Sequence, residues 1–210
     1  MQVIDKESFF RWSHVSRETM ERFSEYESCL VEWQSKINLV SASTLPFVWH
    51  RHFWDSAQLA ELVPGTARSW VDLGSGAGFP GLVLALLIAE RQPFTVHLVE
   101  SDQRKSIFLR EVIRRTGASA IVHTGRMEAT ETIAATGICD GGSARACAPL
   151  DRLLGWARPY FGPQTLGLFL KGVKVEDELT KAQKSWKFKF TRIPSQAEAE
   201  GTILKVEHLA

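Results

Sequence analysis

An acid followed by closely spaced glycines marks the stretch best suited to binding a small molecule. It reads Val71-Asp72-Leu73-Gly74-Ser75-Gly76-Ala77-Gly78-Phe79-Pro80-Gly81, with four glycines within eight positions. Glycine accepts positive φ and lets a ligand touch bare backbone, and proline is suited to the first turn of a helix. The run therefore predicts a buried strand, a ligand-binding loop and a helix.

A second acid, Glu100, ends the next predicted strand about twenty residues downstream, where an acid usually accepts hydrogen bonds from ribose hydroxyls. Behind such a loop, Glu100 favours a ligand that contains a nucleoside. The alternative for Glu100 is a solvated acid at the end of a strand.

The identity of the nucleoside depends on Asp72. The spacing Gly76-x-Gly78-x-x-Gly81 also fits the dinucleotide fingerprint, which leaves a nicotinamide-dependent oxidoreductase as an alternative. A carboxylate just before the glycine turn repels a pyrophosphate but attracts the ammonium end of S-adenosylmethionine. The acid therefore favours the methyl donor as cofactor.

Composition describes an ordinary globular protein. The chain has 210 residues, 44% of them hydrophobic, and a formal net charge of +1. The net charge is too small to indicate a nucleic-acid partner by itself. Three cysteines without CxxC spacing argue against a disulfide framework and against a metal site, and favour a cytoplasmic protein. The sequence also lacks a signal peptide and an apolar run long enough to span a membrane.

The chain divides at about residue 65 into a helical cap (1–65) and a Rossmann-like domain (66–210), which together should form one compact unit. Apolar residues at helical spacing predict helices from about Ser16 and over about 45–63. From Ser69 onward, short strands alternate with helices, which is typical of a parallel sheet. Strands are expected near 69–73, 94–99, 119–123, 138–144, 164–170, 187–193 and 202–208, and helices near 80–90, 102–116, 128–136, 149–158 and 175–184. The last two strands predict an antiparallel hairpin at one edge of a seven-stranded, mostly parallel α/β sheet.

Candidate site residues follow the carboxyl ends of the predicted parallel strands, where ligands bind in such folds. The glycine loop, Glu100, the pair Met127-Glu128 and Arg145 should therefore meet at one rim. Fold alone supports many chemistries, so a binding or assembly protein without catalytic activity is a further alternative.

The sequence resembles the RsmG (GidB) family of bacterial 16S ribosomal RNA methyltransferases from about residue 22 to the C-terminus. Besides the glycine loop, the resemblance rests on Ile37-Asn38-Leu39-Val40, Arg51-His52-Phe53-Trp54-Asp55-Ser56, Phe108-Leu109-Arg110-Glu111-Val112, Asp140-Gly141 and Leu170-Lys171-Gly172.

This resemblance implies a class I S-adenosylmethionine-dependent methyltransferase that modifies N7 of a guanine in the 530 loop of 16S ribosomal RNA, at position 527 in the usual rRNA numbering. Either the RNA or the small ribosomal subunit would be its partner. The expected cofactor-binding residues are Asp72, Gly74, Gly76, Gly78, Phe79, Glu100, Met127, Glu128 and Arg145. The Gly142-Ser143-Ala144 stretch departs from the family pattern, and glycine weakens a central strand, so the position of Arg145 is the open point.

RNA binding requires cations that can reach phosphates. Lys105 falls near the buried stripe of its predicted helix and should lean over the rim, and Lys171 follows the fifth predicted strand. Arg51 and His52 of the cap either reach RNA or brace the cap. Because N7 already carries an available lone pair, no general base is expected and no single catalytic residue is assigned. A monomer is compatible with the short cap and the balanced charge.

Overall fold

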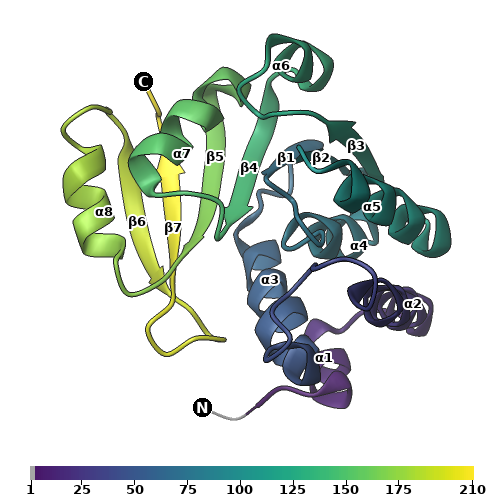
Figure 1. The fold of residues 1–210 in the computed structure, drawn as a ribbon. Helices are drawn as coiled ribbons and strands as arrows, with labels where there is room; N and C mark the ends of the chain where they lie inside the picture. Colours follow the sequence, from purple (N-terminus) through teal and green to yellow (C-terminus); the bar gives the residue numbers. More distant parts are fainter. Residues whose placement is uncertain (1–2) are drawn as a thin grey trace.

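A computed structural model describes residues 3–210 as a twisted sheet with helices on both faces (Figure 1). The sheet has seven strands in the order β3-β2-β1-β4-β5-β7-β6. The direction of winding reverses between β1 and β4, so the crevice for a ligand is expected at the carboxyl ends of these two strands.

The first five strands are parallel to one another, and the last two form an antiparallel hairpin, as the sequence predicts. Strand β7 lies between β5 and β6 and is antiparallel to both, so the hairpin forms the edge of the sheet. The strands are β1 (Ser69–Leu73), β2 (Thr95–Glu100), β3 (Ala120–Thr124), β4 (Cys139–Arg145), β5 (Phe161–Lys171), β6 (Lys189–Pro194) and β7 (Thr202–Glu207).

Helices α4 (Gly81–Ala89) and α5 (Gln103–Thr116) cover one face of the sheet. Helix α4 is apolar on all sides and almost wholly buried, because the cap covers the side that the sheet leaves open. Helix α5 begins at Asp102, whose carboxylate accepts from the amides of Arg104 and Lys105, and it ends at Gly117 with φ 65°.

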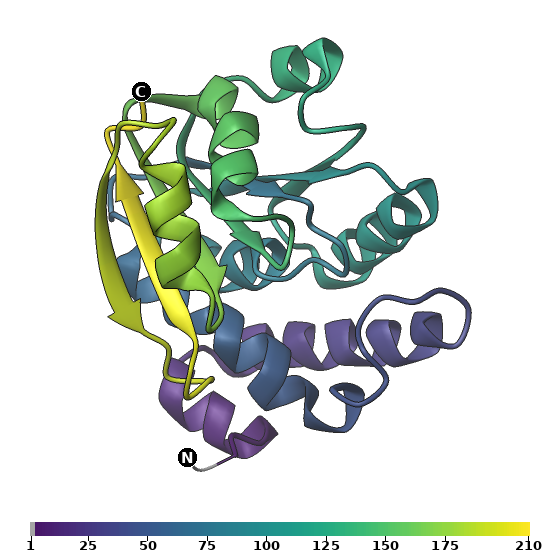
Figure 2. The same cartoon turned by 60° about the vertical axis from the view of Figure 1, so that its left-hand side comes forward.

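Helices α6 (Thr130–Thr136), α7 (Leu150–Ala157) and α8 (Val175–Ala182) lie over the opposite face, as the turned view shows (Figure 2). A second apolar core forms there between α7, α8 and the side chains of β1, β4, β5 and β7. Alternate residues of each strand therefore serve different cores, so Trp70 packs toward the cap and Val71 packs toward α7 and α8.

The cap contains α1 (Lys6–Ser13), α2 (Arg17–Gln34) and the helical segment 45–62, which all lie on the α4 side of the sheet (Figure 2). Ser16 caps α2 by accepting from the amide of Thr19, as expected. Arg115 of α5 joins the cap through ion pairs with Glu25 and Glu32.

The expectation of one regular helix over 45–63 is wrong in its interior. The segment comprises a 3-10 turn η1 (Leu45–Phe47), a π-helix η2 (Trp49–Trp54), a short α-helix α3 (Asp55–Ala57) and a second 3-10 turn η3 (Gln58–Leu62). A regular surface helix buries one stripe, whereas residues 52–60 are buried without interruption. The segment is buried on several sides, since Trp54 packs on Trp12 of α1 and Phe53 packs on Phe23 of α2 and on Phe79, and π-turns are frequent at functional sites.

Candidate functional site at the switch point of the sheet

The glycine loop between β1 and α4 is held in a conformation that side chains rarely adopt. Gly74, Gly76 and Gly78 have φ of 68°, 56° and 90°. A Cβ atom added to Gly74 would lie 2.8 Å from Sγ of Cys147, and one added to Gly78 would lie 2.6 Å from the hydroxyl of Tyr26. The loop therefore requires glycine for both its conformation and its close neighbours.

Asp72 lies beneath this loop with no exposed surface. Its Oδ1 accepts from the hydroxyl of Ser143 at 2.7 Å, and its Oδ2 is buried without a hydrogen-bond partner. Burial raises the pKa of Asp72 to about 6, against the opposing hydrogen bond from Ser143. A side chain so placed acts on a bound cation through its charge and supports the loop from below.

The Gly142-Ser143-Ala144 departure has a structural reason in this chain. Ser143 holds Asp72 and also accepts from the indole nitrogen of Trp70 at 3.1 Å. A Cβ atom on Gly142 would lie 2.8 Å from the Phe161 ring, so the glycine makes room for this large neighbour. Strand β4 pairs with β1 from Gly141 to Ser143 and with β5 up to Arg145, so the backbone of Arg145 is held by the strand ladder with β5.

Glu100 holds the loop from the neighbouring strand. Its Oε2 accepts from the amide of Gly76 and its Oε1 from the amide of Asp102, both at 2.8 Å, and the residue is 7% exposed. Glu100 therefore joins the glycine loop to the first turn of α5, and each oxygen retains a lone pair for a further donor.

A cavity of about 280 Å³ opens beside Gly74 and Ser101, the residue that follows Glu100. Its wall includes the expected pair Met127 and Glu128, and the hydroxyl of Tyr160 fixes the Met127 carbonyl at 2.6 Å. Trp156, which sequence reasoning did not single out, also lines it. The full lining is Gly74, Ser101, Gly125, Arg126, Met127, Glu128, Cys147 and Trp156.

Phe79 joins the loop to the cap. Its ring stacks on Tyr26 with centroids 5.2 Å apart, stacks on His52 at 5.1 Å and meets the edge of Phe53 at 5.4 Å. The guanidinium of Arg145 lies 5.1 Å from the centre of the same ring. The Tyr26 hydroxyl also donates to the carbonyl of Ala77, so α2 holds the loop at two points.

Arg145 is bound to the cap by several contacts. It approaches Nδ1 of His52 at 2.9 Å, donates to the Arg51 carbonyl at 3.1 Å and pairs with Asp55 at 3.3 Å. Burial, followed by the charges of Arg145 and Arg51, lowers the pKa of His52 to about 3, so its ring is neutral and accepts from Arg145. Neither Tyr26 nor Asp55 was expected as a site residue, because their contacts with Ala77 and Arg145 span 51 and 90 positions.

The four expected RNA-binding residues differ in their surroundings. Lys171 is almost buried, donates to the Ala148 carbonyl and pairs with Glu178, both at 2.8 Å. His52 is buried and neutral. Arg51 pairs with Glu198 but keeps 42% of its side-chain surface exposed, and Lys105 is half-buried near the start of α5. The structure therefore gives Lys171 and His52 internal partners and leaves Arg51 and Lys105 partly open to solvent.

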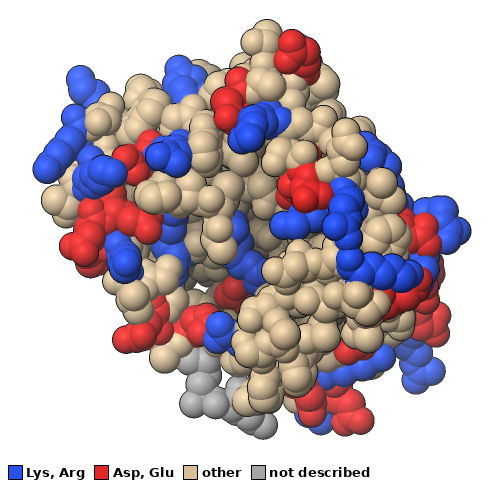
Figure 3. All heavy atoms as spheres, viewed as in Figure 1, with Lys and Arg blue, Asp and Glu red and all other residues tan. Residues whose placement is uncertain are grey.

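A larger cavity of about 640 Å³ lies next to Arg145, between the cap, the end of β5 and the β6–β7 loop. Charged atoms of both signs border the hollow near the middle of the face in Figure 3. The segment 145–147 separates this cavity from the smaller one, since Arg145 and Ala146 line the former and Cys147 lines the latter.

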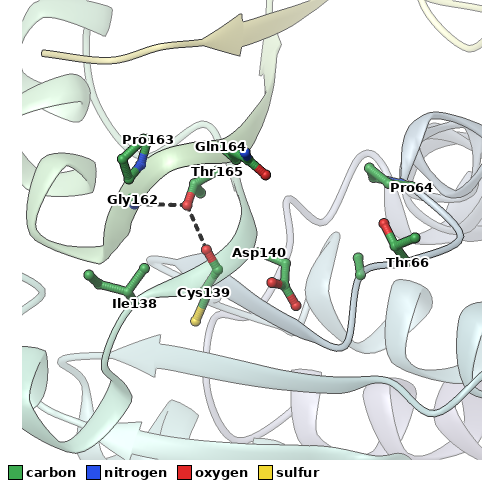
Figure 4. A pocket seen from close by; sticks show the side chains of 10 residues that line it. Pro64, Thr66, Ile138, Cys139, Asp140, Gly162, Pro163, Gln164 and Thr165 are labelled. Carbon is green, nitrogen blue, oxygen red and sulfur yellow. Dashed lines mark hydrogen bonds between the residues drawn. The ribbon is translucent and has the colours of Figure 1, made fainter.

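A third cavity, of about 430 Å³, lies at the amino ends of the strands, opposite the glycine loop (Figure 4). Its polar groups bind one another: Thr165 donates to the Cys139 carbonyl at 2.7 Å, and Asp140 accepts from the amides of Arg68 and Ser69. The glycines with positive φ and the buried charged side chains lie together at the opposite edge, at the carboxyl ends of the strands. We therefore take that edge as the functional site.

Within residues 3–210, no three metal-ligating side chains cluster. The helices of that same range are too short or too polar to cross a membrane.

The neutral state of His52 links stability to pH. Its pKa is about 3 in the folded protein and about 6.5 unfolded, so the stability that neutral His52 provides is full above about pH 6.5 and is lost as pH falls. We expect His52→Asn to be less stable than wild type at about pH 7.5, and the deficit to shrink by about 1 kcal/mol at about pH 5.5. Urea unfolding of both proteins at each pH measures this difference in the free energy of unfolding. Titratable groups present in both proteins cancel in the comparison. A deficit independent of pH would contradict the neutral state of His52.

Comparison with known proteins places the chain in a family. The model of the GidB family, rRNA small subunit methyltransferase G, matches residues 19–202. Ribosomal RNA small subunit methyltransferase G of Parvibaculum lavamentivorans is 59% identical over 208 residues, which cover 99% of this chain and 91% of the relative. The protein of the same name from Paramagnetospirillum magneticum is 49% identical over 198 residues, covering 94% and 93%.

Solved structures with a similar fold are more distant in sequence. Fibrillarin of Aeropyrum pernix, with natively bound S-adenosyl-L-methionine, has a TM-score of 0.57 and 15% identity and covers 75% of each chain. An O-methyltransferase from Bacillus cereus has a TM-score of 0.59 and 15% identity over 88% of this chain and 90% of that one. The chain belongs to the GidB family of rRNA small subunit methyltransferases G, and it has the Rossmann-like fold of class I S-adenosylmethionine-dependent methyltransferases.

Proposed function

We propose that this protein transfers a methyl group from S-adenosylmethionine to N7 of a guanine in the 530 loop of 16S ribosomal RNA, at position 527 in the usual rRNA numbering. The family assignment supports the reaction and its RNA substrate. The observation that carries the proposal is the glycine cradle at the switch point, with Arg145 and Phe79 beside it and an open cavity of mixed charge next to them.

The chain's own residues fit the cofactor. The loop keeps glycine at three positions of positive φ, and at Gly74 and Gly78 a Cβ atom would also collide with neighbouring groups. Glu100 has lone pairs for ribose hydroxyls, and Met127 and Glu128 line the adjacent cavity suited to an adenine. The unpaired Oδ2 of Asp72 adds negative charge beneath a ligand that carries positive groups.

The residues around the site supply position and charge rather than a proton acceptor. Bound S-adenosylmethionine carries an activated methyl group on a sulfonium, and guanine N7 has an available lone pair. Burial raises the pKa of Cys147, which lies against Gly74, to about 11, and this disfavours the thiolate that a nucleophile requires. Catalysis then depends on holding N7 in line with the methyl group.

RNA contacts are divided between exposed and internal cations. Arg51 and Lys105 reach solvent on the two sides of the site and are the proposed phosphate ligands. His52 and Lys171 act through their neighbours, since His52 orients Arg145 and Lys171 fixes the chain after β4 at Ala148.

We further propose that the cap (1–65) and the Rossmann-like domain (66–210) form one compact unit that acts as a monomer in the cytoplasm. Ion pairs of Arg115 with Glu25 and Glu32, together with the Phe79 contacts, support the single unit. The family's ribosomal substrate supports the cytoplasm.

Two glycine substitutions separate cofactor binding from backbone strain. Gly74→Ala and Gly117→Ala both place alanine at positive φ, 68° and 65°, and each should cost about 1 kcal/mol of stability. Only Gly74 has a crowded Cβ position, whereas nothing lies within 4 Å of one on Gly117. We expect Gly74→Ala to weaken S-adenosylhomocysteine binding at least about tenfold in calorimetry and Gly117→Ala to leave it unchanged. Equal affinities would argue against the cradle.

Direct mapping of the methylated nucleotide tests the reaction. Small subunits from bacteria lacking N7 methylation of the 530 loop, and naked 16S RNA, are incubated with the protein and S-adenosylmethionine. N7-methylguanosine is then located by borohydride and aniline cleavage. We expect one new cleavage at the 530-loop guanine in at least one substrate. Methyl transfer to another position, or none to either substrate, would refute the proposal and favour a binding or assembly role.

A further inference from the structure

The larger cavity beside Arg145 is lined by charged side chains of both signs, of which Arg145 pairs with Asp55 and Arg51 pairs with Glu198. Arg145 and Lys171 come from the ends of β4 and β5, and Glu198 comes from the β6–β7 loop opposite. The Oε1 atom of Glu198 pairs with Arg51, while its Oε2 has no hydrogen-bond partner among residues 3–210. About a third of the Glu198 side-chain surface is exposed, so this second oxygen is available to a molecule in the cavity.

The loop that carries Glu198 is held in place. The hydroxyl of Ser195 accepts from the amides of Ala197 and Glu198, both at 3.1 Å, and the Ser195 amide donates to the Gly201 carbonyl at 2.9 Å. Gln58 of the cap ties the loop to the site, since its side chain donates to both Ser195 and Asp55, the partner of Arg145. Glu198 therefore has a fixed position relative to Arg145.

Guanine has its acceptors and donors on different edges. N7 and O6 are acceptors, whereas N1–H and the N2 amino group are donors on the Watson–Crick and minor-groove edges. A guanine in this cavity that turns N7 toward Phe79 of the glycine loop, which the Arg145 guanidinium contacts, turns N1–H and N2–H₂ toward the β6–β7 loop. A carboxylate accepts from this donor pair, but adenine offers an unprotonated N1 there and no N2 amino group.

We propose that Glu198 is the specificity-determining residue that reads the N1–H and N2–H₂ groups of the target guanine in this cavity. The inference rests on the proposed function and names the group that selects the base. Methylation at N7 makes the base cationic and its N1–H more acidic, so the hydrogen bond to Glu198 strengthens as the reaction proceeds. Glu198 thereby favours guanine both on binding and in the transition state.

The test combines a protein variant with a substrate variant. Glu198→Gln, the matched Glu200→Gln from the same loop and cavity edge, and wild type are assayed on 16S RNA carrying guanine or inosine at the target position. Inosine lacks only the N2 amino group. We expect inosine to lower kcat/KM about tenfold for wild type and Glu200→Gln, and Glu198→Gln to be about tenfold or more slower on guanine and nearly insensitive to inosine.

Binding of S-adenosylhomocysteine, measured by calorimetry, should be the same for all three proteins and shows that each variant is folded. Equal rates of wild type on guanine and inosine, a full inosine effect in Glu198→Gln, or an equal defect in Glu200→Gln would each overturn the assignment. If Glu198→Gln fails to fold, the wild-type comparison of guanine and inosine still decides whether the N2 amino group is read. Failure of wild type on guanine itself would instead refute the proposed function.

Discussion

The stacking of Phe79 between the cap and Arg145 is the interaction on which the arrangement of the site depends. Phe79 ends the glycine loop, and it contacts Tyr26, His52, Phe53 and Arg145. Aromatic pairs of this kind contribute about 0.5–1.5 kcal/mol beyond the area they bury. Several contacts on one ring therefore hold a loop whose glycines provide little rigidity of their own.

This arrangement also explains how charged groups can be buried at the switch point. Arg145 is close to a neutral His52 and to Asp55. Burial raises the pKa of Asp55 above its usual value, although the charge of Arg145 opposes this shift. Asp72 has Ser143 as its partner on one oxygen and no partner on the other. Buried polar groups without full pairing are costly, and their concentration beside the glycine loop is typical of a binding site rather than of a structural core.

The sequence was sufficient to predict the strands and the antiparallel hairpin, because hydrophobic periodicity is a local signal, and the rim where Gly74, Glu100 and Arg145 lie, because parallel strands share one carboxyl edge. It was not sufficient to predict the π-helix over 49–54, whose side chains pack against α1, α2 and Phe79. The small residues of β4 suggested a weak strand, but Phe161 fills the space beside Gly142. Contacts between distant residues decide such cases.

The sequence identified basic side chains near the site but not whether each is paired, neutral or free to bind RNA. A lysine after a strand and a histidine in a basic run suggest RNA contacts, yet Lys171 pairs with Glu178 and His52 is neutral. The sequence did not identify Glu198 as a site residue, because only the folded chain brings it to the cavity that Arg145 also lines.

Hydrogen–deuterium exchange with and without S-adenosylhomocysteine most directly tests the central claim that cap and cofactor loop form one site. If the cap and the loop form one site, the ligand slows exchange both in the glycine loop 74–79 and in the cap segment 49–57. The cap segment lines no part of the smaller cavity, so direct contact with a ligand there would not explain its protection. Slower exchange in the loop alone, with the cap segment unchanged, would contradict the claim.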